Sequence, residues 1–157
     1  MMRFLPFLAA ALLAAGCSSG STDSDDQRVL IQISNTGAEP LQCRLMFGHW
    51  VDRDLGLARN GDGSSEDIFV LVRQQAGDGA LYVMRDDGKR RMMVENIFCA
   101  RPDDWQATVS QIDLAAARAA RPASVHVTCA LPESGGRVIC GKPEFMFIGS
   151  ATIWDKI

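Results

Sequence analysis

The sequence predicts an all-β domain, an antiparallel β-sandwich of seven to nine strands with one short helix. Three observations favour this fold class. Short runs rich in Val, Ile, Phe and Met recur along the chain, Gly, Asp and Pro clusters separate them, and several runs alternate apolar with polar residues. An immunoglobulin-like arrangement is one form of such a sandwich. A closed β-barrel is the alternative that the same pattern allows.

The first two predicted strands show the alternation most clearly. In 28–34 (RVLIQIS) the apolar residues share one face of the strand. In 41–47 (LQCRLMF) the apolar face includes Cys43, whereas Gln42 and Arg44 take the other face. An inward cysteine is what a disulfide between two packed sheets requires.

The middle of the chain contains the strongest hairpin signals. A polar loop is predicted at 52–65. Strands predicted at 66–75, 80–85 and 90–99 are separated by AGDG and DDGK, and Asp-Gly tolerates the positive φ that tight turns need. In 92–98 both faces are mostly apolar, as in a strand covered on each side.

The last third of the chain contains the one helix candidate. The segment 105–112 (WQATVSQI) alternates and is predicted to be a strand. A helix is predicted at 113–120 (DLAAARAA), because Asp113 can cap its start, alanine favours helix and Pro122 stops it. Further strands are predicted at 124–130, 137–140, 144–150 and 151–154. The apolar C-terminal segment is interpreted as a central strand, with an exposed patch that docks a partner as the alternative.

The first 16 residues have a composition unlike the rest of the chain. One basic residue, Arg3, precedes an uncharged apolar run at 4–15 that ends in small residues. This is the pattern of a secretory signal peptide. A transmembrane helix needs about 20 apolar residues, and Pro6 interrupts this shorter run.

The end of this leader, LAAGC at 13–17, resembles the lipobox of bacterial lipoproteins. The motif is short and covers only the leader and its cysteine, and Ala14 stands where leucine is commonest. Small residues before the cysteine admit the peptidase, and the cysteine supplies a thiolate nucleophile. The resemblance implies that Cys17 receives a diacylglyceryl group, that 1–16 are removed, and that the new amino terminus is acylated with chains such as palmitate.

The same resemblance implies a location. Lipoproteins with Asp after the cysteine stay at the inner membrane, so Ser18 implies the outer membrane, facing the periplasm. Several acyl chains give a stable anchor, since each buried CH₂ contributes about 0.8 kcal/mol. The polar residues that follow form a tether of about 17 Å end to end. The predicted organisation is a leader at 1–16, a lipidated cysteine and tether at 17–27, and a single β domain at 28–157.

Four cysteines remain beyond Cys17. An even number in an exported chain suggests two disulfides, for which three connectivities exist. Cys129 and Cys140 flank a segment whose Gly-Gly pair suits a hairpin turn, so this pair is favoured, and it leaves Cys43 with Cys99. The chain has no Cys-x-x-Cys and only two histidines, a spacing that fits no zinc site.

Charge and motifs argue against several function classes. The net charge is −3, and no basic cluster exceeds Lys89-Arg90-Arg91, so no nucleic acid partner is expected. In the predicted mature chain, 17–157, Gly-x-Ser-x-Gly and Ser-x-x-Lys do not occur, and cysteines in disulfides are not free nucleophiles. His126 alternates with inward valines and is expected to face solvent. We therefore predict no enzyme, with no catalytic residue.

The segment FGHWVDRDLG has the most unusual composition. His49, Asp52 and Asp54 are candidates for a small metal or proton-transfer site at a strand end. The interpretation we favour is that Trp50 packs at the edge of the core and the polar residues face water, because no third strong ligand is well spaced. The acidic, glycine-rich stretch from Asp52 fits no EF-hand register. No metal and no cofactor are expected.

These observations predict a binding or structural role in the cell envelope, with the membrane bound through the lipid on Cys17 and an envelope protein as partner. Two alternatives stay open. One is an inhibitor that blocks a periplasmic hydrolase with the loop at 131–136 (LPESGG) or at 52–65. The other is a metal-dependent sugar binder or enzyme centred on His49, Asp52 and Asp54.

Overall fold

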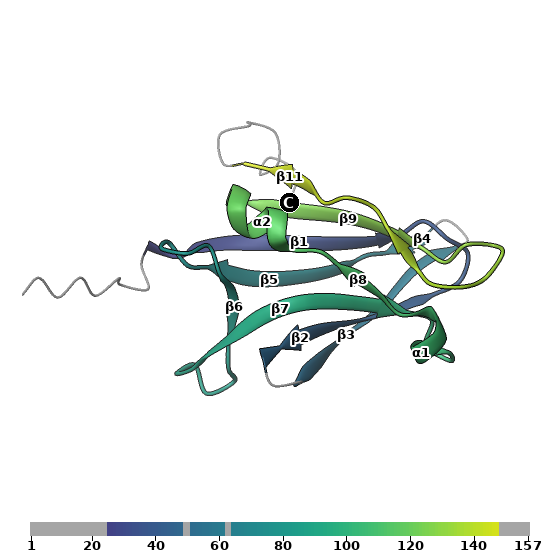
Figure 1. Cartoon of the computed structure of the whole chain (residues 1–157), viewed down its shortest axis with the longest axis horizontal. Coiled ribbons are helices and arrows are strands. Elements are labelled where there is room, and N and C mark those ends of the chain that lie inside the picture. Colours follow the sequence, from purple (N-terminus) through teal and green to yellow (C-terminus); the bar gives the residue numbers. More distant parts are fainter. Residues whose placement is uncertain (1–24, 49–50, 62–63, 148–157) are drawn as a thin grey trace, which may run out of the picture.

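The computed structural model describes residues 25–48, 51–61 and 64–147. The strands are β1 (Gln27–Asn35), β2 (Leu41–Phe47), β3 (Asp52–Gly61), β4 (Ser64–Glu66), β5 (Ile68–Gln74), β6 (Leu81–Met84), β7 (Arg91–Ala100), β8 (Ser110–Ile112), β9 (Ser124–Ala130), β10 (Ile139–Cys140) and β11 (Glu144–Met146). The helices are α1 (Trp105–Thr108) and α2 (Ala115–Ala120). The prediction of an all-β, sandwich-like domain is confirmed (Figure 1).

All eleven strands belong to one sheet that folds over on itself. Its order is β10-β9-β1-β5-β6-β7-β2-β3-β4, with β11 paired to β9 and β8 paired to β7. Strand β7 belongs to both layers, because Arg91–Met93 pairs with β6 and the residues from Val94 onward pair with β2. The path has two ends, so the sheet does not close into the barrel that was the alternative prediction.

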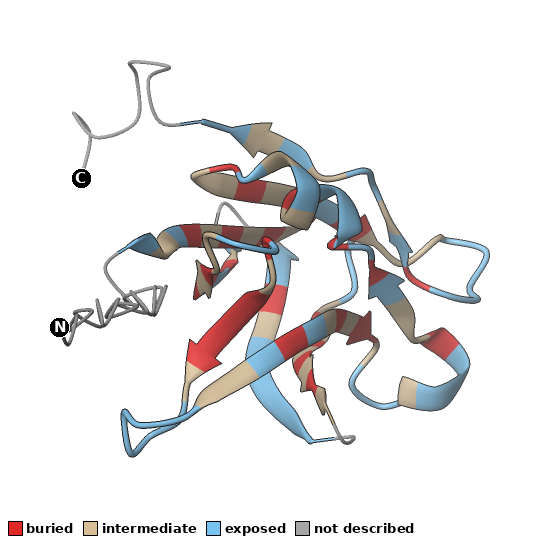
Figure 2. Ribbon diagram, turned by 60° about the vertical axis from the view of Figure 1, so that its left-hand side comes forward, coloured by how far each residue is buried: buried red, intermediate tan, exposed pale blue. Residues whose placement is uncertain are grey.

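The core lies between the two layers. Alternate residues of β1, β2 and β9 point into it, as the periodicity predicted, and in Figure 2 buried positions alternate mostly with intermediate ones along such strands. The inward residues of these strands are Val29, Ile31, Ile33, Leu41, Cys43, Leu45, Phe47, Val125, Val127 and Cys129. The sheet is mixed rather than purely antiparallel, because β1 and β9 run parallel to each other. Parallel neighbours need a crossover connection, and the segment containing α2 leads into β9.

The prediction of a polar loop at 52–65 is wrong. This segment forms β3 and β4, and β3 pairs with β2 from Asp52 to Ala58. The polar composition of this segment suggested a loop. It is compatible with a strand because the charged residues of β3 are exposed, while Leu55 and Leu57 are half-buried. Gly56, with a φ of 94°, lies at an irregularity of the β2–β3 register.

The segment 105–112 also differs from the prediction. Its first half forms the single-turn helix α1, and only Ser110–Ile112 forms a strand. The Thr108 hydroxyl donates to the Asp104 carbonyl and accepts from the Arg101 amide, which stabilises the turn. The indole of Trp105 lies against the guanidinium of Arg44, 4.3 Å from ring centre to carbon. The predicted inward residues of this segment therefore do not form one buried strand face, since Ala107 is exposed and Trp105 and Val109 are half-buried.

The C-terminal apolar segment is an edge strand in the described residues, which corrects the prediction of a central strand. β11 has β9 as its ladder partner, and Phe145 packs against the core. Met146 and Phe147 are 41% and 48% exposed. The strand predicted at 151–154 lies outside the described residues.

Two disulfides link the pairs that were favoured from sequence. Cys43 and Cys99 lie directly opposite each other on β2 and β7 and are bonded, so this bond joins neighbouring strands rather than two packed sheets as predicted. Cys129 and Cys140 lie opposite each other on β9 and β10 and are also bonded. The first bond closes a sequence separation of 56 residues and the second one of 11.

The buried side chain of Gln74 holds helix α2 against the turn between β5 and β6. Its amide nitrogen lies 3.0 Å from the Gly79 carbonyl oxygen, 3.2 Å from that of Ala117 and 3.0 Å from that of Arg118. Gly79 has a φ of 74°, and a Cβ there would lie 2.3 Å from the Arg118 carbonyl oxygen. Helix, turn and strand thus approach each other where only glycine fits.

We expect both disulfides to stabilise the domain, and the longer closed loop to contribute more. The chain-entropy relation gives about 4 kcal/mol for Cys43→Ala/Cys99→Ala and about 3 kcal/mol for Cys129→Ala/Cys140→Ala. Urea unfolding of the two double variants measures this order. An equal loss in both variants would contradict the loop-length argument.

Replacement of Gly79 by alanine should lower the free energy of unfolding by about 2 kcal/mol or more, because the left-handed backbone and the close Arg118 carbonyl both oppose a side chain. Gly77→Ala is the matched control in the same turn, since a Cβ at Gly77 meets nothing within 4 Å. Thermal unfolding of the two variants, compared with the parent chain, checks the difference. Similar unfolding midpoints for Gly79→Ala and Gly77→Ala would contradict the requirement for glycine at position 79.

Candidate functional site

One edge of strand β5 is largely without a neighbouring strand in the described residues. Its ladder with β1 runs along the whole strand, from Ile68 to Gln74. On its other side, β6 pairs only with Arg73 and Gln74 before it crosses to β7. Among the described residues, no backbone hydrogen bond outside the ladders involves Ile68–Val72. Within the part of the chain that the structure describes, this stretch of β5 therefore pairs on one side only.

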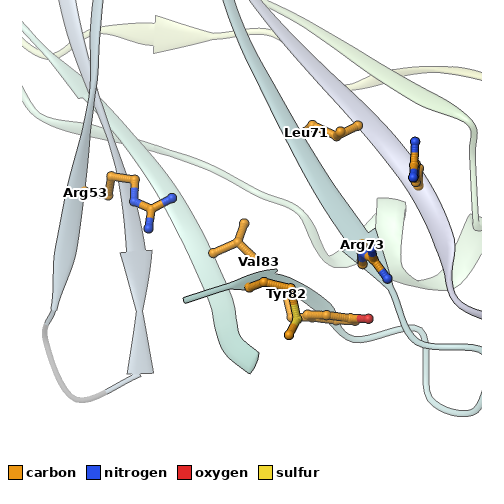
Figure 3. Close-up of a pocket in the computed structure, with 7 residues that line it drawn as sticks. Arg53, Leu71, Arg73, Tyr82 and Val83 are labelled. Atoms are coloured by element: carbon orange, nitrogen blue, oxygen red, sulfur yellow. The ribbon is translucent and has the colours of Figure 1, made fainter. Parts of the chain in front are cut away.

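A cleft lies along this edge, between β5 and β3. Its volume is about 370 Å³. Figure 3 shows Arg53 on one side of the cleft, Leu71 and Arg73 on the other, and Tyr82 and Val83 of β6 between them. The complete lining is Arg28, Arg53, Leu71, Arg73, Tyr82, Val83 and Met84. Three arginines line it, and none of these described lining residues is acidic.

The three arginines come from three different strands. Arg28 and Arg73 lie opposite each other in the β1–β5 ladder, so they share the outer face of the sheet. Arg73 also interacts with the Tyr82 hydroxyl. Arg53 is 3.5 Å from Asp86, whose side chain is 98% exposed. An ion pair between such exposed groups contributes little, so Arg53 is available to another anion.

Beside the cleft, the outer face of β5 exposes two large apolar side chains. Phe69 is 61% exposed and Leu71 is 58% exposed. They alternate with the buried residues Ile68, Val70 and Val72, so they point away from the core. Large exposed apolar residues next to convergent charged groups are typical of binding surfaces.

A buried carboxylate fixes the start of β1 near the cleft. Asp26 accepts a hydrogen bond of 2.8 Å from the Tyr82 hydroxyl and one of 3.1 Å from the Ala76 amide, and it pairs with Arg91 at 3.1 Å. The Tyr82 hydrogen bond, with those other contacts, lowers the pKa of Asp26 despite its burial. Burial, followed by the Asp26 contact, raises the pKa of Tyr82. Both groups therefore keep their ordinary charge states at neutral pH.

The residues singled out from sequence do not belong to this cleft. Asp52 pairs with Arg44 at 3.3 Å, and Asp54 accepts a hydrogen bond from the Gln42 side chain. Both are exposed on β3 and engaged by the neighbouring β2, while His49 lies outside the described residues. No group of three metal-ligating side chains occurs in the part of the chain that the structure describes.

Two other predicted features are placed by the structure. His126 is half-buried rather than simply solvent-facing, since its ring contacts the Ser34 hydroxyl at 2.9 Å and lies 3.9 Å from the Glu144 carboxylate. The 131–136 loop has exposed glycines with positive φ and follows the cysteine of the second disulfide. Neither feature contributes a residue to the cleft lining.

Sequence reasoning missed the cleft. Arg28, Arg53 and Arg73 are far apart in the chain, and only the sheet topology brings them together. The one available signal was the uninterrupted apolar run FVLV at 69–72. Such a run puts apolar residues on both faces of a strand, and here only one face is covered.

No family model, curated protein or solved structure matches the chain. Within the described residues, the helices are too short to cross a membrane. Function is therefore argued from the chemistry of the site itself.

We expect Asp26→Asn to destabilise the chain at neutral pH and to reduce its loss of stability in acid. The pKa of Asp26 is lowered from its ordinary value of 3.8 in the folded chain. At pH values between the folded and unfolded pKa, the folded chain therefore binds fewer protons than the unfolded chain. The contribution is complete above pH 3.8 and disappears as pH falls through the lower folded-state pKa.

Urea unfolding between about pH 2.5 and about 7 measures this effect, because carboxyl groups titrate at roughly pH 2 to 5. Glu133→Gln is the matched control, because Glu133 lies exposed in the 131–136 loop. An acid dependence in Asp26→Asn as steep as in the parent chain would contradict the assignment.

Proposed function

We propose that the chain is a lipid-anchored binding module of the bacterial outer membrane that faces the periplasm and carries out no catalysis. The observation that carries the binding role is the outer face of β5, where Phe69 and Leu71 are exposed beside the arginine-lined cleft. An exposed apolar pair with adjacent charge provides contact area and orientation for a partner. The partner is a protein of the cell envelope.

The location rests on the leader and on the two disulfides. The lipobox-like LAAGC motif places the lipid on Cys17. Two disulfides within one domain fit a chain that folds in an oxidising compartment such as the periplasm. An anchor close to the domain raises its effective concentration toward partners in the same membrane.

The first test concerns the anchor. Intact-mass analysis of the native product should find a chain that begins at Cys17 and carries acyl groups. The Cys17→Ser variant should keep its leader and lack these groups, since the serine hydroxyl does not replace the thiolate. An unmodified thiol at Cys17, or a leader still attached in the parent chain, would remove the basis for the location.

The second test concerns the binding face. In-cell crosslinking of the anchored chain should capture a defined partner that Phe69→Ser/Leu71→Ser no longer captures. Ile139→Ser/Met146→Ser is the matched control, because these apolar residues are exposed elsewhere, at 64% and 41%. Capture that is equally lost in the control, or unchanged in the β5 variant, would contradict binding through β5.

A further inference from the structure

We propose that the open edge of β5 binds an extended, acidic segment of a partner polypeptide by strand addition. The inference rests on the binding role proposed above and names the chemistry that the site recognises. The segment pairs its backbone with Ile68–Val72 and places a carboxylate among Arg28, Arg53 and Arg73.

The first argument is the backbone of β5. A strand that is paired on one side presents N–H and C=O groups on the other, and these groups template a further strand. Proteins usually protect such edges with charged residues, prolines or bulges. Here the unpaired stretch Ile68–Val72 contains only apolar residues. Its edge is therefore chemically suited to an added strand.

The second argument is the charge at the end of this edge. Arg28 and Arg73 lie directly opposite each other in an antiparallel ladder, where like charges destabilise the sheet. The nearby carboxylate of Asp26 attracts Arg73 only weakly, because it is 4% exposed and already engaged by Tyr82 and Arg91. A carboxylate from a partner would relieve the repulsion, and guanidinium groups bind carboxylates with paired hydrogen bonds.

The two arguments together specify a sequence pattern. Phe69, Leu71 and Arg73 alternate along one face of β5, so the facing residues of an added strand also alternate. Apolar side chains suit the positions beside Phe69 and Leu71. Because β6 already pairs with Arg73, the acidic residue follows the paired stretch and reaches the arginines from its end. The partner segment therefore contains a carboxylate, one residue of any type, an apolar residue, another of any type and a second apolar residue, read in either direction.

An anionic lipid surface is the competing occupant, because arginines also bind phosphate. Phosphate recognition alone would not need an unpaired strand edge or the exposed Phe69. A second copy of this chain is another competitor, since two β5 edges can pair with each other. The observations favour the peptide, and the experiment separates all three.

The test uses the whole chain with Cys17→Ser in a mild detergent, so that no acyl chain contributes and the apolar leader that this variant keeps does not aggregate. A fluorescent nine-residue peptide with the pattern Glu-Thr-Val-Thr-Val at its centre is titrated by anisotropy. We expect saturable binding that weakens about tenfold or more in Arg28→Gln/Arg53→Gln. Arg59→Gln/Arg137→Gln changes the net charge equally, and both residues are exposed away from the cleft. This control should bind within about twofold of the parent.

Two altered peptides test the mode of binding. A peptide with Lys in place of Glu should lose binding at least as strongly as the arginine variant does. A peptide N-methylated at alternate residues should also lose binding, because it cannot donate to the β5 edge. Unchanged affinity for the methylated peptide would overturn strand addition, and unchanged affinity for the lysine peptide would overturn carboxylate recognition.

Two further measurements address the competitors. Vesicles of phosphatidylglycerol that bind through Arg28 and Arg53, with no binding of the acidic peptide, would overturn the proposal in favour of a lipid surface. A dimer in solution that Leu71→Lys separates, again without peptide binding, would assign the edge to a second copy. Acylation of Cys17 is measured separately, so a failure of this inference and a failure of the proposed anchor give different results.

Discussion

The crossing of β6 from β5 to β7 is the constraint on which the rest of the structure depends. β6 pairs with two residues of β5 and then becomes part of the ladder with β7, so it links the two layers of the sheet. Gln74 fixes the turn that precedes β6, because its amide donates to carbonyl oxygens of both the turn and α2. Gly79 allows the close approach of the turn to α2. Had β6 continued alongside β5, the edge at Ile68–Val72 would be paired and the cleft would not form.

Strand β5 contains a region where local sequence preferences conflict with the fold. Most apolar side chains of the described domain face the core, although some others, such as Ile139 and Met146, are also exposed. On the outer face of β5, two large apolar side chains are exposed, and Arg73 faces Arg28 across the ladder. Such conflicts lower stability and tend to persist only where function requires them. Their coincidence with an unpaired edge makes β5 the most informative strand of the domain.

Periodicity predicted those features of the fold that depend on local sequence alone. The alternation in β1, β2 and β9 identified their inward faces, and the turn between Cys129 and Cys140 identified that disulfide. β3 was missed because its polar sequence resembles a loop, whereas its strand structure depends on pairing with β2. The cleft was missed for a related reason. Arg28 and Arg53 are 25 positions apart in the sequence, and their proximity depends on a strand crossing that no local pattern encodes.

The position of the first described residues of the domain, next to the cleft, connects the proposed anchor with the proposed ligand. Asp26 is fixed by Tyr82 and Arg91, and Arg28 lies in the cleft two residues later. Eight residues lie between Cys17 and Asp26, so the two are at most about 30 Å apart when the chain is extended. An anchored domain would therefore hold its cleft close to the membrane surface. Edge pairing with a short segment is weak by itself, but a high effective concentration near the membrane compensates for low affinity. Selection of the partner then depends on two independent requirements, an acidic extended segment and a location within reach of the tether.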